Sequence, residues 1–140
     1  MLKGFFNVPA PINEPVYSYA PGTNERALLK AAIAEARAQE IDVPMYIGGE
    51  EVRTENKAKL TPPHDHQHVL GYYSQGTKQH VKDAINAALA AKNDWENLPW
   101  EQRAAIFLKA AELISTKYRY KLNAATMLGQ SKNPYQAEID

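Results

Sequence analysis

The chain has 140 residues, which is enough for one domain with its own core. Its 16 basic and 16 acidic residues give a formal net charge of zero, which argues against a broad attraction to nucleic acid or anionic lipid. Cysteine is absent, which excludes disulfides, thiolate metal ligands and a cysteine nucleophile from these residues.

Residues 1–22 are predicted to form an extended arm. Four of the nine prolines lie there, and proline fixes the backbone and removes a hydrogen-bond donor. The arm also carries aromatic side chains that need an apolar surface to lie on, namely Phe5, Phe6, Tyr17 and Tyr19. We therefore expect residues 1–22 to lie across another part of the protein, and residues 23–140 to form the N-terminal part of an incomplete domain.

One helix and four short strands are predicted next. The helix starts at Thr23 or Asn24 and runs to about Gln39, with an apolar face formed by Leu29, Ile33 and Ala36. Residues 44–54 are typical of a hairpin, because apolar residues alternate on either side of the tight turn at Gly48-Gly49. Segments 57–62 and 69–74 would form a second extended pair around the polar stretch PHDHQ.

The remainder is predicted to be helical. The first helix follows Thr77 and has its apolar residues at helical spacing: Val81, Ile85, Ala88, Leu89, Ala91 and Trp95. Pro99 opens the next helix, with apolar residues at Ile106, Phe107, Ala110, Leu113 and Ile114. A third helix runs from about Tyr118 to Leu128, and Gly129 is predicted to be its C-terminal cap.

The sequence NPYQAEID predicts the start of a fourth helix. Asn133 can accept a free backbone N–H, and Pro134 suits the first helical position. This helix would stop within two turns, at Asp140, with nothing to cap its carbonyl groups. We therefore expect the chain to be the front portion of a longer protein.

The stretch HDHQH could bind a metal. If it were a strand, His64, His66 and His68 would project from one face, and three imidazoles can hold zinc. The alternative, which we favour, is a solvated turn, because the stretch follows Thr61-Pro62-Pro63. Pairing of Asp65 with one of the histidines as acid and base would need a fixed geometry that a turn rarely supplies.

Structural roles are expected for the other residues that could bind a ligand or take part in catalysis. Trp95 and Trp100 flank the connection between two helices and are expected to seal it by burial. Alternating cations and tyrosines at 117–121 are interpreted as a solvated helix face. The glycines form neither a dinucleotide nor a phosphate loop, and the serines Ser74, Ser115 and Ser131 lack an obvious base. We predict no catalytic, cofactor-binding or metal-binding residue in this chain.

Several stretches, taken in order, resemble the amino-terminal portion of the aldehyde dehydrogenase superfamily. They are the hairpin MYIGGEEVRT, the segment LTPPHDHQHVLGYYS, the helices from VKDAINAALAAKNDW to RAAIFLKAAELIS, and the ending MLGQSKNPYQAEID. The arm NEPVYSYAPGTNERALL and the ending QAEID resemble the branch that acts on 1-pyrroline-5-carboxylate. The resemblance implies an α/β fold with an extended arm, small antiparallel strands and a helical layer of the coenzyme domain.

The resemblance also implies a function for the complete protein. It would be an NAD-dependent oxidoreductase that converts L-glutamate γ-semialdehyde to L-glutamate in proline catabolism, using a cysteine nucleophile. The nucleophile and the NAD contacts would lie downstream, so the 140-residue chain alone is predicted to be inactive. Its partner would be the remainder of the dehydrogenase, in a homo-oligomer.

Two further expectations accompany this interpretation. With no apolar run near roughly 18 residues and no secretory signal, the sequence predicts a cytoplasmic location without a membrane partner. An alternative function is a free-standing helical interaction module, which would bind a partner through the Leu29–Ile33 or the Val81–Trp95 face.

Overall fold

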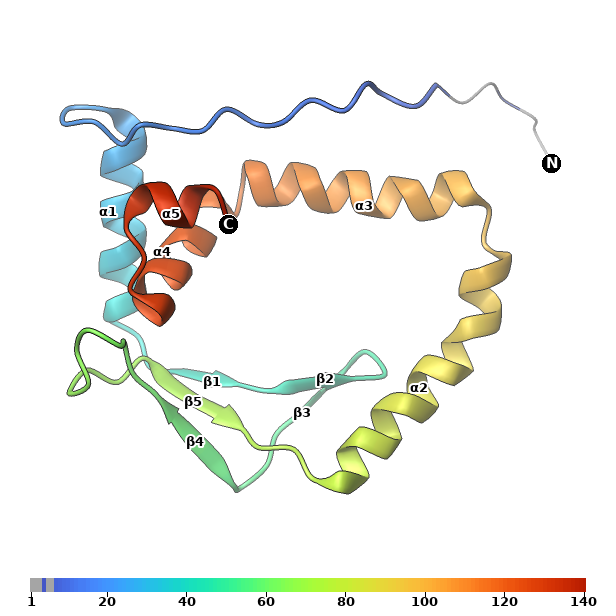
Figure 1. Ribbon diagram of the computed structural model, residues 1–140. Helices are drawn as coiled ribbons and strands as arrows, with labels where there is room; N and C mark the ends of the chain where they lie inside the picture. The colour runs from blue at the N-terminus through green and yellow to red at the C-terminus, as the bar shows by residue number, and fades with distance from the viewer. Residues whose placement is uncertain (1–3, 5–6) are drawn as a thin grey trace.

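The computed structural model describes residue 4 and residues 7–140 (Figure 1). Its helices are α1 (Asn24–Arg37), α2 (Lys78–Asn97), α3 (Trp100–Ser115), α4 (Arg119–Gln130) and α5 (Pro134–Glu138). Its strands are β1 (Ile41–Val43), β2 (Met45–Ile47), β3 (Glu50–Val52), β4 (Lys57–Leu60) and β5 (Gly71–Ser74). Helices α1, α4 and α5 lie together at one end of the structure (Figure 1). Helix α2 extends away from the end of β5, and α3 runs from α2 back towards α4.

The arm is extended, as predicted. Residues 7–20 contain neither helix nor strand, and residues 7–16 are exposed. Tyr19 is buried against α1 and α4, so this part of the arm does lie across another part of the protein. Phe5 and Phe6 lie outside the described residues, and the division of the chain at residue 22 stays a prediction.

The hydrophobic core is small and lies where the arm crosses α1 and α4. Tyr19, Leu29 and Ala124 are its buried members, and Tyr17, Ala32, Ile33, Tyr120 and Met127 pack around them. Leu29 and Ile33 of the predicted apolar face of α1 therefore lie in the core. Thr23 precedes this helix without capping it, because its hydroxyl donates to the Ala20 carbonyl instead, at 2.8 Å.

A three-stranded sheet has the order β1-β5-β4. The pairing of β4 with β5 is antiparallel, as expected, but β1 was not predicted and lies parallel to β5. Gly71 permits this approach: its φ is +148°, and a Cβ there would lie 2.1 Å from the Ile41 carbonyl oxygen. The sequence did not show β1, because a three-residue strand ending before Pro44 is too short to show a period.

Strands β2 and β3 form the predicted hairpin. They pair antiparallel from Met45 with Val52 to Ile47 with Glu50. Gly48 and Gly49 have φ values of +62° and +87°, the conformation that a two-residue hairpin turn requires.

Side-chain caps mark the start of two of the described helices. Thr77 and His80 form a capping box at the start of α2, and Asn133 and Gln136 form one at the start of α5. The prediction for Gly129 was wrong: α4 runs through it, and Ser131 is the residue in the left-handed conformation, with φ +58°. None of the helices in the described part of the chain has the length and apolarity needed to cross a membrane.

Candidate functional site

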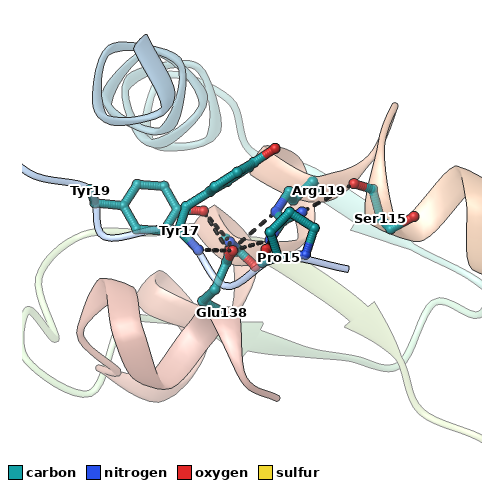
Figure 2. Close-up of polar contacts among 7 residues, drawn as sticks. Pro15, Tyr17, Tyr19, Ser115, Arg119 and Glu138 are labelled. Carbon is teal, nitrogen blue, oxygen red and sulfur yellow. Dashed lines mark hydrogen bonds and ion pairs between the residues drawn. The ribbon is translucent and has the colours of Figure 1, made fainter. Parts of the chain in front are cut away.

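A buried ion pair joins the arm to the last two helices. The Glu138 cluster comprises Tyr19, Arg119, Asn123 and Glu138 together with the backbone of Pro15 and Tyr17. The side chains of Arg119 and Glu138 form the salt bridge and are only 8% and 1% exposed. Figure 2 shows the Glu138 carboxylate pointing towards Arg119 and the two tyrosines of the arm.

The Glu138 carboxylate accepts hydrogen bonds from two other segments. From the arm, the Tyr17 backbone N–H donates at 3.0 Å and the Tyr19 hydroxyl at 2.5 Å. From α4, the Asn123 amide donates at 2.6 Å, and the Arg119 guanidinium donates as well. Arg119 and Asn123 are four residues apart on one helix, so they share a face and reach the same carboxylate.

Arg119 also binds the arm directly. Its guanidinium donates to the Pro15 carbonyl, and its carbon lies 4.1 Å from the centre of the Tyr17 ring (Figure 2). A third contact goes to the Ser115 carbonyl at 3.4 Å. The interpretation of residues 117–121 as a solvated face was therefore wrong for Arg119, which is 7% exposed. Charge alternation alone could not show which cation has a buried partner.

The protonation of this cluster is fixed near neutral pH. Burial alone would raise the pKa of Glu138, but hydrogen bonds from Arg119 and Tyr19 lower it from its ordinary 4.5 to about 2. The pKa of Tyr19 is raised to about 12, mainly by burial and secondly by the hydrogen bond that its hydroxyl donates to Glu138. Neither group therefore exchanges protons near pH 7, so the cluster holds three segments together and supplies no general acid or base.

The histidine stretch is a turn, so the strand on which the zinc alternative depends does not form. Backbone hydrogen bonds from Asp65 to Pro62 and from His68 to Asp65 define the turn. His64 instead contacts the Ser131 hydroxyl at 2.7 Å and tethers the turn to the end of α4. In the described residues, no group of three His, Cys, Asp or Glu side chains could hold a metal ion.

The residues considered for catalysis have structural partners. Asp65 forms its ion pair with Arg37, at 2.9 Å, and also interacts electrostatically with His68. The Ser74 hydroxyl accepts from the Thr54 N–H, and Ser115 donates to a carbonyl of its own helix. Ser131 and His64 are exposed, and no contact of the described chain adds an acid that orients this pair.

Apolar side chains on α2 and α3 are exposed. Within these two described helices, no residue is buried. The exposed set comprises Val81, Ile85, Leu89, Trp95, Trp100, Ile106, Phe107, Leu108 and Ile114. The Trp95 and Phe107 rings meet edge to face with their centres 6.4 Å apart, but Trp95 is 42% exposed and Trp100 is 52% exposed. The expectation that both tryptophans are buried at this junction was therefore wrong within this chain.

Comparison with known proteins places the chain in a family. A model of the aldehyde dehydrogenase family matches residues 51–140. The chain belongs to the aldehyde dehydrogenase family. It is 56% identical over 136 residues to the Δ1-pyrroline-5-carboxylate dehydrogenase of Agaricus bisporus, and 46% identical over 134 residues to the mitochondrial enzyme of that name from Dictyostelium discoideum. Each match covers 96% of this chain, but only 25% and 24% of those relatives.

A solved structure has the same arrangement. The Δ-pyrroline-5-carboxylate dehydrogenase of Mycobacterium tuberculosis, bound with NAD and cobalamin, matches with a TM-score of 0.95 and 42% identity. The match covers all of this chain and 26% of that one. The expected fold, the amino-terminal part of the aldehyde dehydrogenase fold, is therefore confirmed. This aldehyde dehydrogenase chain spans about a quarter of the length of the relatives it matches.

Proposed function

We propose that this chain is the amino-terminal segment of an NAD-dependent dehydrogenase that oxidises L-glutamate γ-semialdehyde, the open form of 1-pyrroline-5-carboxylate, to L-glutamate. The observation that carries the proposal is the match along nearly the whole chain to enzymes named for this substrate. In this proposal the segment is a scaffold, and the reaction takes place on residues outside it.

The coenzyme would bind outside the described residues. Among the described glycines, only Gly48 and Gly49 are adjacent, and they form the hairpin turn. Gly22 and Gly76 precede α1 and α2 as single glycines, so no glycine-rich loop forms at the start of a described helix. These residues therefore do not fit NAD, and no step of hydride transfer is assigned to them. Support for NAD as the coenzyme comes from the Mycobacterium tuberculosis structure that contains it.

The exposed faces of α2 and α3 support a scaffold role. Large apolar side chains such as Leu89 and Phe107 are 63% and 66% exposed, whereas burying one such side chain contributes roughly 1.5–3 kcal/mol. These faces would pack against the remainder of the dehydrogenase. A free-standing interaction module would also use such a face, so exposure alone does not separate the two functions.

A chimeric enzyme would distinguish a dehydrogenase segment from a free-standing interaction module. Residues 1–140 would replace the matching quarter of the Mycobacterium tuberculosis dehydrogenase, and NAD⁺ reduction with 1-pyrroline-5-carboxylate would be measured. We expect an active chimera, and no turnover by the 140-residue chain alone. A chimera that folds and binds NAD⁺ but is inactive, or turnover by the chain alone, would contradict the proposal.

Location and assembly are further parts of the proposal. We predict a homo-oligomer, which analytical ultracentrifugation of the active chimera and of the complete enzyme would test. The cytoplasmic location expected from the sequence stays a prediction, since the name of the Dictyostelium relative includes the word mitochondrial. Fractionation of cells that express the tagged complete enzyme tests it.

A further inference from the structure

Three segments far apart in the sequence share one carboxylate. Glu138 lies at the end of α5, and its hydrogen-bond donors come from the arm and from α4. The Tyr17 N–H that it accepts is 121 residues away in sequence. A buried carboxylate needs all of its lone pairs satisfied, so the donors from one segment affect how firmly the others are held.

The described part of the arm and α5 have few other attachments. Residues 7–20 of the arm pair with no strand, and residues 7–16 are exposed. Outside the cluster, the arm is held by the packing of Tyr17 and Tyr19 in the core and by the Arg26 guanidinium, which donates to the Tyr19 carbonyl at 3.0 Å. Helix α5 has five residues, too few to be stable in isolation. Its remaining anchors are the capping box at Asn133, the buried Ala137 and an exposed ion pair between Lys132 and Asp140. The Glu138 cluster is therefore the attachment that both segments share.

Release of the arm would weaken the cluster from both sides of the ion pair. Glu138 would lose the Tyr17 and Tyr19 donors, and Arg119 would lose the Pro15 carbonyl and the ring of Tyr17. Release of α5 would in turn leave the Arg119 guanidinium without its anion beneath the arm.

We propose that the Glu138 cluster makes the docking of the arm and the docking of α5 mutually dependent, so that residues 15–19 act as a strap that closes over α5. The coupling is reciprocal, because any stabilisation that the bound arm gives to α5 is given equally by bound α5 to the arm. This inference concerns the folded structure alone and does not depend on which reaction the complete enzyme catalyses.

The test perturbs one segment and measures the other, by amide hydrogen exchange in the full-length protein. Asn133→Ala removes the cap of α5 without touching the arm, because the Asn133 side chain contacts only the start of its own helix. Loss of such a cap should speed exchange of the Ala137 and Ile139 amides about 5-fold. Coupling predicts that the Tyr17 amide accelerates by a similar factor.

A matched variant controls for general loosening. Thr77→Ala removes the equivalent capping box from α2, which contributes nothing to the Glu138 cluster, so Tyr17 exchange should not change. In the reverse direction, Tyr19→Phe removes one donor to a charged acceptor and should speed Ala137 and Ile139 exchange about 10-fold or more.

Two results would overturn the inference. One is that Tyr19→Phe leaves Ala137 and Ile139 exchange at the wild-type rate. The other is that Tyr17 exchange is equal in the Asn133→Ala and Thr77→Ala proteins. Faster Tyr17 exchange in Asn133→Ala and faster Ala137 and Ile139 exchange in Tyr19→Phe, with no change of Tyr17 exchange in Thr77→Ala, support the strap.

Discussion

Replacing Glu138 with glutamine should release the arm. The substitution keeps the shape of the side chain but removes the negative charge that faces Arg119, whose side chain is 8% exposed. The folded pKa of about 2 lies roughly 2.5 units below the ordinary 4.5, which corresponds to about 3 kcal/mol of stabilisation at pH 7. Removing one partner of a buried ion pair typically costs about 3–5 kcal/mol, which agrees with the value obtained from the pKa of Glu138.

Native-state proteolysis measures this loss. Chymotrypsin cleaves after tyrosine, and the buried Tyr19, which is 4% exposed, becomes accessible to it only when the arm opens. Because cleavage follows the population of the open state, a loss of about 3 kcal/mol predicts a rate about 150-fold higher after Tyr19 in the full-length protein.

Two controls accompany the measurement. Glu112→Gln removes the acid of the exposed Lys109–Glu112 pair, whose side chains are 61% and 60% exposed, and should leave cleavage of the arm unchanged. The double variant Arg119→Met, Glu138→Gln removes both charges and should cleave more slowly than Glu138→Gln alone. If Glu138→Gln cleaves within fivefold of wild type, the ion pair does not hold the arm and the reasoning fails.

Three further predictions concern pH, glycine and metal. Because the folded pKa of Glu138 is lower than its unfolded value, the stability that ionised Glu138 gives to the folded state is complete above about pH 5 and is lost as the pH falls towards 2. The near-ultraviolet circular dichroism of the tyrosines should therefore change between about pH 5 and 2 in the wild type. It should not change in this range in Glu138→Gln. Gly71→Ala should destabilise by about 3 kcal/mol or more, since its Cβ would meet the Ile41 backbone, whereas Gly129→Ala, in open space on a helix, should stabilise by up to about 1 kcal/mol in thermal unfolding. The protein should retain no stoichiometric zinc after dialysis, because His64, His66 and His68 lie on a turn; one bound equivalent, lost on His66→Ala, would show that the turn rearranges into a site.

Periodic and capping signals predicted most of the elements. The spacing of Val81, Ile85 and Leu89 located α2, and the Gly48-Gly49 pair located the hairpin. These signals are local: each depends on residues within about two turns or one hairpin. The family resemblance supplied the architecture that the local signals could not.

The Glu138 cluster could not be predicted from such signals. Arg119 lies in a run of alternating cations and tyrosines, and Glu138 lies in a short terminal helix; nothing local links them. Their pairing depends on the path of the chain through Ser131, where the left-handed turn brings α5 back beside α4. The strand β1 was missed for a related reason, because its partner β5 begins 30 residues later, at Gly71.

The separation between the arm and its anchor also has a kinetic consequence. Tyr17 leaves the ribosome well before Glu138, because 121 residues separate them. At a synthesis rate of about 5–20 residues per second, this separation leaves the two arm tyrosines without their anion for roughly 6–24 s. During translation the arm therefore waits for its Glu138 anchor, and attachment through that carboxylate belongs among the last steps of folding for this part of the nascent chain.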